Sequence, residues 1–199
     1  MTLRADLEII HDWITPRAKV LDLGCGDGTL LAHLQQRHNV SGYGLEIDEK
    51  NIATCIRAGV NVIHTDLDAG LADFEADTFD YVIMTQTLQA MHFPERLLDE
   101  MLRVGRQGIV TFPNFGHWPN RIQLALGGHM PVTRTLPSEW YDTPNIHLCT
   151  IADFERLCEQ KGIEILERSV VNRKHNKTLL ASKLPNLFGE IALYRIHHP

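Results

Sequence analysis

The sequence predicts an α/β protein with a doubly wound, mostly parallel β-sheet. An apolar strand at Val20–Leu23 runs into glycines at alternate positions, Gly24, Gly26 and Gly28, and a helical stretch begins at Thr29. Strand and helix then alternate up to the middle of the chain. Such alternation implies right-handed crossovers and a parallel sheet with helices on both faces. Two more strands near the end bring the expected number to seven.

Four helices are expected in the first part of the chain, because apolar residues recur there at three- and four-residue spacing. The first stops before Pro16, the third is capped by Asp48 and ends at Gly59, and the fourth ends at Gly105. These helices cover residues 3–14, 29–36, 48–58 and 94–104. Short apolar runs predict the strands at 20–23, 40–46, 61–64, 79–84 and 108–112.

Residues 113–149 interrupt this pattern, because they are rich in Pro, Gly, Asn and aromatic residues. A long irregular segment inside a compact domain is usually a lid or a binding loop. Regular structure resumes with Thr150 and Asp153, which have the spacing of a capping box and begin a helix. Strands are then expected at 163–171 and 187–196, the last one antiparallel.

The composition is that of a soluble globular protein, with 199 residues of which 44% are hydrophobic and 22% charged. We expect a single cytoplasmic domain over residues 1–199, with 113–149 as a lid and no membrane association. The formal net charge of −6 argues against nucleic-acid binding, which needs a basic surface. The basic cluster at 173–177 is interpreted as a solvated turn. No CxxC or CxxH spacing occurs, so neither a metal site nor a disulfide framework is expected.

Glycines and polar groups gather at the carboxyl ends of four expected strands, where an open parallel sheet binds its ligands. They are the turn at 22–28, Glu46, Asp66-Leu67 and Thr85-Gln86. A carboxylate such as Glu46 can accept hydrogen bonds from both ribose hydroxyls. Asp66 can accept from an exocyclic amine while the Leu67 N–H donates to a ring nitrogen. Each group alone has a structural explanation, as tight packing, a solvated strand end or a helix cap. Together they predict a site for an adenosine-containing ligand.

Over residues 15–112 these motifs resemble the class I S-adenosylmethionine-dependent methyltransferases, which have a Rossmann-like fold. More narrowly, much of the chain resembles the methionine biosynthesis protein MetW family. This resemblance is carried by the strings MTQTLQAM at 84–91, FPNFGHW at 112–118 and LPSEWYDTPNIH at 136–147. It implies S-adenosylmethionine or S-adenosylhomocysteine as the ligand. It also implies a role in methionine biosynthesis with homoserine O-acyltransferase, as an activating or regulatory partner.

The resemblance further implies which residues bind the ligand. The glycine turn would hold the methionyl part, the carboxylate after the second strand the ribose, and the acidic pair after the third strand the adenine. The end of the fourth strand would close over the ligand next to the transferable methyl group. The implied set is Asp22, Gly24, Cys25, Gly26, Glu46, Ile47, Asp66, Leu67, Thr85 and Gln86.

Methyl transfer from a sulfonium is an in-line displacement, so positioning of the acceptor can supply much of the catalysis. A base is needed only for an acceptor that arrives protonated. The candidate bases in the expected lid are His117, Tyr141, Asp142 and His147. His147 has a simpler explanation, a hydrogen bond to backbone beside the capped helix. The aromatic residues of the expected lid are Trp118, Trp140 and Tyr141. Three explanations are open for them: they line an acceptor pocket, they pack together as a small loop core, or they form a surface for a partner protein.

Three functions are compatible with these residues. The first is an S-adenosylmethionine-binding partner of an acyltransferase, and the second is a methyltransferase with a small-molecule acceptor under the lid. The third, a nicotinamide-dependent dehydrogenase, is disfavoured because Thr29 stands where GxGxxG has its third glycine. The fourth strand ends in Thr85-Gln86-Thr87-Leu88, without the Asn/Asp-Pro-Pro-Tyr/Phe signature of methyltransferases acting on amino groups of DNA or protein. This also disfavours a nucleic-acid substrate.

Overall fold

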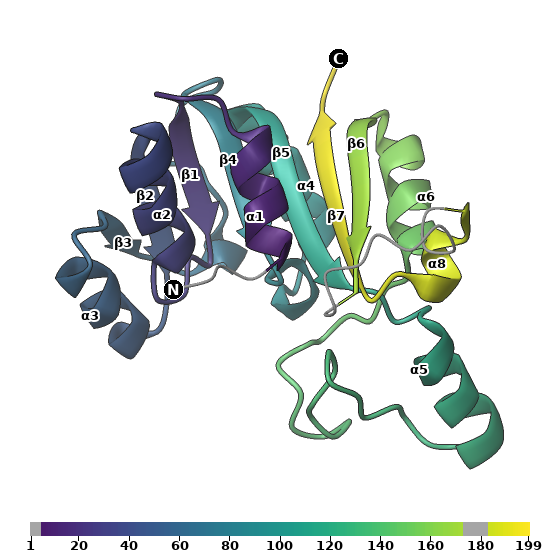
Figure 1. Cartoon of the computed structure of the whole chain (residues 1–199). Coiled ribbons are helices and arrows are strands. Elements are labelled where there is room, and N and C mark those ends of the chain that lie inside the picture. The colour runs from purple at the N-terminus through teal and green to yellow at the C-terminus, as the bar shows by residue number, and fades with distance from the viewer. Residues whose placement is uncertain (1–4, 173–182) are drawn as a thin grey trace.

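The computed structural model of the chain describes residues 5–172 and 183–199, so the basic cluster at 173–177 lies outside the described residues. Within them, seven strands form one sheet in the order β3-β2-β1-β4-β5-β7-β6. The first five strands are parallel, and β7 runs antiparallel to both of its neighbours. The predicted doubly wound sheet and its antiparallel last strand are confirmed (Figure 1).

The strands are β1 (Lys19–Leu23), β2 (Ser41–Glu46), β3 (Val62–His64), β4 (Phe79–Thr85), β5 (Gly105–Pro113), β6 (Glu164–Val171) and β7 (Ile191–His197). The helices that cover the sheet are α1 (Ala5–Trp13), α2 (Thr29–His38), α3 (Glu49–Arg57), α4 (Pro94–Val104) and α6 (Ile151–Lys161). Shorter helical pieces are η1 (Leu67–Ala69), η2 (Leu88–Ala90), α5 (Trp118–Ile122), η3 (Gln123–Gly127) and α8 (Pro185–Phe188).

Two hydrophobic cores hold the sheet between its helices. Residues of α1, α2 and α3 pack on one face, and residues of α4 and α6 pack on the other (Figure 1). On the second face the rings of Phe112, Phe154 and Tyr194 are mutually packed, with centroids 4.7 to 6.0 Å apart. This packing joins β5, α6 and β7, and so fixes the antiparallel end of the sheet against the parallel part.

Glycines in β2 let the strand lie close to its neighbours. A Cβ on Gly42 would stand 1.8 Å from the Val20 carbonyl oxygen, and one on Gly44 would stand 2.4 Å from Cys25 Sγ. Cys25 itself is buried, so it is a small side chain that fits against Gly44. The backbone of β2 therefore packs against β1 at Gly42 and against the Cys25 side chain of the glycine turn at Gly44.

Three differences from the predicted elements are larger than two residues. The segment expected to be irregular contains α5 and η3, and Pro119 in the first turn of α5 is the signal that the irregular composition concealed. The last strand begins at 191 rather than 187, because Pro185 starts the short helix α8. Strand β5 begins directly at Gly105, where the α4 helix ends.

The segment at 114–150 leaves the sheet beyond the carboxyl ends of the parallel strands. In Figure 1 it extends away from the edge at which the arrows of β1 and β5 end. The capping box predicted at its far end is present, since the Thr150 and Asp153 side chains each accept from the other's backbone N–H. In the described part of the chain no helix has the length and apolar character needed to cross a membrane.

Candidate functional site

The glycine turn between β1 and α2 is tied to the end of β2. The N–H groups of Gly24 and Cys25 both donate to the Leu45 carbonyl, at 2.9 and 3.1 Å. Gly24 has φ +68°, and a Cβ there would meet the Thr87 hydroxyl oxygen at 2.6 Å. Gly26 also has positive φ, yet nothing lies within 4 Å of where its Cβ would be. The turn therefore presents a bare stretch of backbone at Gly26.

Glu46 closes the turn from the opposite side. Its Oε2 accepts from the Gly26 N–H at 2.8 Å, and its Oε1 accepts from the N–H groups of Ile47 and Asp48, each at 2.9 Å. Its side chain is buried. A carboxylate offers about four acceptor sites, so Oε2 keeps one for a further donor. The structure thus places Glu46 against the glycine turn, and its role in ligand binding stays a prediction.

Asp22 is a buried acid behind this carboxylate. It is 1% exposed, and its Oδ1 has no hydrogen-bond partner within the described residues. Burial, and secondly the nearby charge of Glu46, raise the pKa of Asp22 to about 7. A buried polar atom without a partner is costly, and in a native protein it often marks a functional site. The Asp22 oxygen is suited to receive a donor or a cation from a ligand.

Asp66 and Leu67 lie beside the end of β2. Thr65, the residue before them, donates its N–H to the Glu46 carbonyl at 3.1 Å. Asp66 accepts from the Asp68 N–H at 3.0 Å and caps η1, as the structural explanation predicted, and its side chain remains exposed. Leu67 is buried, whereas Ile47 is 58% exposed. Ile47 is therefore an apolar surface at the rim of the site.

The end of β4 has an unusual backbone. Gln86 has φ +56°, a conformation that is uncommon outside glycine and asparagine. Its N–H donates to the Thr111 carbonyl at 2.9 Å, which fixes the bend against β5. The next residue, Thr87, brings its side chain against Gly24. The strand end containing Thr85 and Gln86 thus meets the glycine turn through Thr87, a contact that the sequence did not reveal.

The candidate bases make contacts of other kinds. Nε2 of His147 lies 3.3 Å from the His92 carbonyl oxygen, which is the backbone hydrogen bond expected as its simpler explanation. The rings of Trp140 and Tyr141 pack edge-on against each other. They do not form a loop core, because Trp140 is 71% exposed and Tyr141 is 70% exposed. His117 precedes α5, and burial lowers its pKa.

Asn114 is a structural residue that the sequence reasoning missed. Its Oδ1 accepts from the N–H groups of Gly116 and Ile151, at 2.9 and 3.2 Å. Its Nδ2 donates to the carbonyls of Asn186 and Gly189, at 3.1 and 2.9 Å. The string at 112–118 included this asparagine, but only the fold reveals that one side chain joins both ends of the segment to α8 and its C-cap residue, Gly189.

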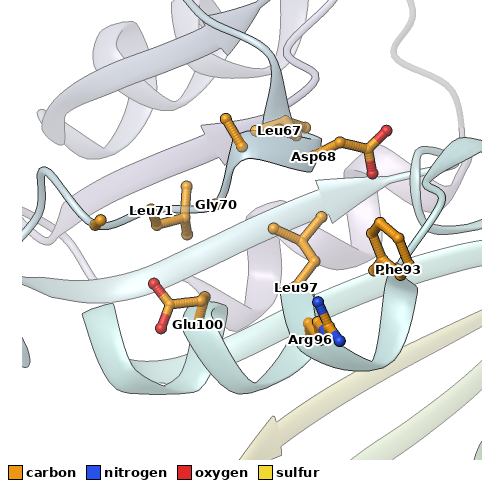
Figure 2. Close-up of a pocket in the computed structure, with 10 residues that line it drawn as sticks. Leu67, Asp68, Gly70, Leu71, Phe93, Arg96, Leu97 and Glu100 are labelled. Atoms are coloured by element: carbon orange, nitrogen blue, oxygen red, sulfur yellow. The ribbon is translucent and has the colours of Figure 1, made fainter.

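A cavity of about 410 Å³ lies between α4 and the loop that begins with Leu67. Figure 2 shows Leu67, Asp68 and Leu71 on one side, and on the other Leu97 and Glu100 of α4 with Phe93, the residue before that helix. At its rim His92 Nδ1 lies 2.5 Å from Asp68 Oδ2, and this contact raises the pKa of His92. Of the predicted ligand-binding residues, Leu67 lines the cavity.

A second cavity of about 370 Å³ lies at the base of the projecting segment, lined by Phe115, Arg121 and Asp153 among others. Over residues 5–172 and 183–199, no three His, Cys, Asp or Glu side chains are arranged to hold a metal ion.

The chain is similar in sequence to known proteins of two kinds. The chain is 36% identical, over 99% of its length, to the bifunctional methionine biosynthesis protein MetXA/MetW of Rhodopirellula baltica, but it spans only 33% of that relative. It is 28% identical, over 66% of its length, to the ubiquinone biosynthesis O-methyltransferase of Pseudomonas fluorescens, and spans 61% of that protein.

The fold has close structural relatives. The crystal structure of an S-adenosylmethionine dependent methyltransferase from Mesorhizobium loti matches with a TM-score of 0.70 and 17% identity, over 96% of this chain and 97% of that one. At such low identity the likeness shows the class I methyltransferase fold alone. The family described as methionine biosynthesis protein MetW matches residues 4–196. The chain therefore belongs to the MetW family, with a methyltransferase-like fold.

Proposed function

We propose that this protein binds S-adenosylmethionine at the carboxyl edge of β1, β2 and β4 and acts with homoserine O-acyltransferase in methionine biosynthesis. The observation that carries the first part is the Glu46 carboxylate facing the Gly26 N–H across 2.8 Å, with the unpartnered Asp22 oxygen behind it. Together they offer a bare backbone, the Glu46 carboxyl group and a second acid to one ligand.

The residues present fit this ligand. Glu46 would bind a ribose hydroxyl through the remaining acceptor site on Oε2. The exposed side chain of Ile47 would cover one face of the adenine, and Asp66 with the Leu67 N–H would bind its edge. Asp22 would bind the cationic amino-acid end, with Gly24, Cys25 and Gly26 beneath it, and Thr85 and Gln86 would close beside the sulfur. When bound, S-adenosylmethionine supplies a sulfonium-activated methyl group.

The regulatory role rests on the relative from Rhodopirellula baltica, whose name joins MetXA and MetW in one chain. S-adenosylmethionine is made from methionine, so a protein that binds it can report methionine supply to an earlier step. Acylation of homoserine is such a step. The finer proposal is that binding of S-adenosylmethionine alters the activity of the acyltransferase through contact with this protein.

Two measurements test the proposal. In a calorimetric titration, S-adenosylmethionine should bind, and NAD should give no heat. At a hundredfold excess over Kd the ligand should stabilise the protein by about 2.7 kcal/mol. In the second, the rate of purified homoserine O-acyltransferase should change when this protein is added, and change again with the ligand. If S-adenosylmethionine does not bind, the proposed binding site is wrong. If the acyltransferase rate does not change, the proposed regulatory role is wrong.

One observation favours a catalytic alternative, methyl transfer to a small molecule. Burial lowers the pKa of His117, which favours the neutral imidazole, the form that a general base requires. The identity with an O-methyltransferase is consistent with it. Incubation with S-adenosylmethionine labelled in the methyl group and a cell extract tests the alternative. A labelled product that is lost in His117→Asn would support it, and no labelled product would oppose it.

A further inference from the structure

Exposed apolar side chains are concentrated in one part of the molecule. Ten of the sixteen large hydrophobic residues that are exposed in the described chain lie within residues 118–148. We call residues 118–148 the apolar segment. The strongest examples are Leu126, Trp140 and Tyr141, exposed by 85%, 71% and 70%. Exposed apolar side chains in this number within one segment are uncommon in a monomeric protein, and where they form a contiguous surface such residues mark interaction sites.

The apolar segment is held in a defined shape. The four hydrogen bonds of Asn114 fix its base, and the N–H groups of Ile146 and His147 both donate to the Gln89 carbonyl, at 2.8 and 3.0 Å. Nearer the tip, the Gln123 side chain donates to and accepts from the Val132 backbone. A surface that is fixed before binding loses less conformational entropy when a partner docks.

The formal charge of the apolar segment narrows the classes of molecule that would bind to it. The apolar segment contains Arg121, Arg134, Glu139 and Asp142, so its formal charge is zero while the whole chain carries −6. Nucleic acids and anionic membrane surfaces both select for a basic surplus. Interface cores between proteins are instead depleted in charge and enriched in aromatic residues. The apolar segment therefore suits another protein with an apolar, weakly charged face.

We propose that a homoserine O-acyltransferase chain docks on the apolar segment, an inference that rests on the function proposed above. The fused relative covers 99% of this chain, so it also contains the segment, while two thirds of its length lies outside the match. A fused chain holds its parts together at high effective concentration. Contact between the two kinds of protein requires a surface on each, and among the described residues the apolar segment holds ten of the sixteen exposed large hydrophobic side chains.

The proposal is tested with Ile122→Ser and Leu126→Ser in one variant. These residues are one helical turn apart and are 47% and 85% exposed. The matched control is Ile56→Ser, on α3, where the side chain is 65% exposed. Binding to the purified homoserine O-acyltransferase of the same organism is measured by sedimentation velocity and by surface plasmon resonance. We expect at least a tenfold weaker Kd for the double variant and less than a twofold change for the control.

The outcomes separate this proposal from the one on which it rests. If the unaltered protein binds the acyltransferase and the double variant binds equally well, the docking surface is wrong and the partnership stands. If the unaltered protein does not bind, both are wrong. A homodimer that the double variant dissociates would show that a second copy of this chain covers the segment, which also overturns the proposal. An unchanged thermal shift with S-adenosylmethionine shows that the double variant is folded.

Discussion

Two regions beyond the carboxyl ends of the strands have opposite character. At the glycine turn the carboxylates of Asp22 and Glu46 are buried and the backbone is left bare. In the apolar segment the reverse holds, since large apolar side chains lie in solvent while the polar Asn114 is buried at the base. Neither arrangement is favourable for an isolated monomer, because one buries charge and the other exposes apolar surface.

The difference indicates two kinds of recognition on one scaffold. Buried carboxyl groups beside a bare stretch of backbone suit a small polar ligand that supplies hydrogen-bond donors. Exposed apolar side chains on a fixed frame suit a protein surface. The two regions meet at the end of β4, where Thr87 packs against Gly24 and the neighbouring Gln89 carbonyl receives the N–H groups of Ile146 and His147. The short helix η2 therefore connects the glycine turn to the apolar segment.

The base of the apolar segment should give the largest effect on stability. Asn114→Ala removes four hydrogen bonds and leaves buried N–H and carbonyl groups without partners. We expect the free energy of unfolding in urea to fall by about 4 kcal/mol. Asn120→Ala, which removes two donated bonds to the same turn, should cost about half as much. Equal and small losses in both variants would show that Asn114 does not hold the segment.

The buried acid at the glycine turn should make stability depend on pH. The folded protein keeps the Asp22 proton up to pH about 7, while the unfolded chain releases it near 3.8. Raising the pH therefore favours unfolding, and the stability present below pH 3.8 is lost as the pH rises through 7. Relative to Asp22→Asn, the unfolding free energy should fall on the order of 3 kcal/mol between pH 4 and pH 8.

Denaturant melts of both proteins at a series of pH values provide this measurement. A difference that stays constant from pH 4 to pH 8 would mean that Asp22 is ionised in the folded protein throughout. Addition of S-adenosylmethionine sharpens the test, because a cation beside Asp22 favours its ionised form. The affinity of the unaltered protein should then rise with pH between 6 and 8, and that of Asp22→Asn should not.

Much of the glycine-turn site could be predicted from the sequence, and little of the apolar segment could. Gly24, Gly26 and Glu46 follow one another at the spacing of a β–α–β unit, so parallel strands bring them together without further information. Residues 114–150 have no such periodic rule. Their shape depends on Asn114 meeting Gly189, which is 75 positions away, and a contact at that separation leaves no local pattern.

Glu46→Gln should weaken ligand binding with little effect on the fold. The amide keeps one acceptor for the Ile47 and Asp48 N–H groups, but it has no charge and places an NH2 group toward Gly26 or the ribose. We expect S-adenosylmethionine to bind about 30-fold more weakly, about 2 kcal/mol. The exposed neighbour Glu49, changed to Gln, serves as the control and should leave Kd within twofold. Calorimetric titration measures both, and equal affinities would remove Glu46 from the site.

The smallest effect on stability should come from removing two exposed aromatic rings of the apolar segment. Trp140→Ser and Tyr141→Ser together delete two large aromatic side chains, and the same change in a core normally costs several kcal/mol. Both rings are about 70% exposed and pack mainly on each other, so we expect the free energy of unfolding to change by less than about 0.5 kcal/mol. Phe112→Ala, in the ring cluster with Phe154 and Tyr194, should lose about 4 kcal/mol in the same melts. A loss above 2 kcal/mol for the double variant would mean that these rings stabilise the monomer. A negligible loss would mean that the two aromatic side chains do not stabilise the folded monomer, and it would point to a role in contacts with another molecule.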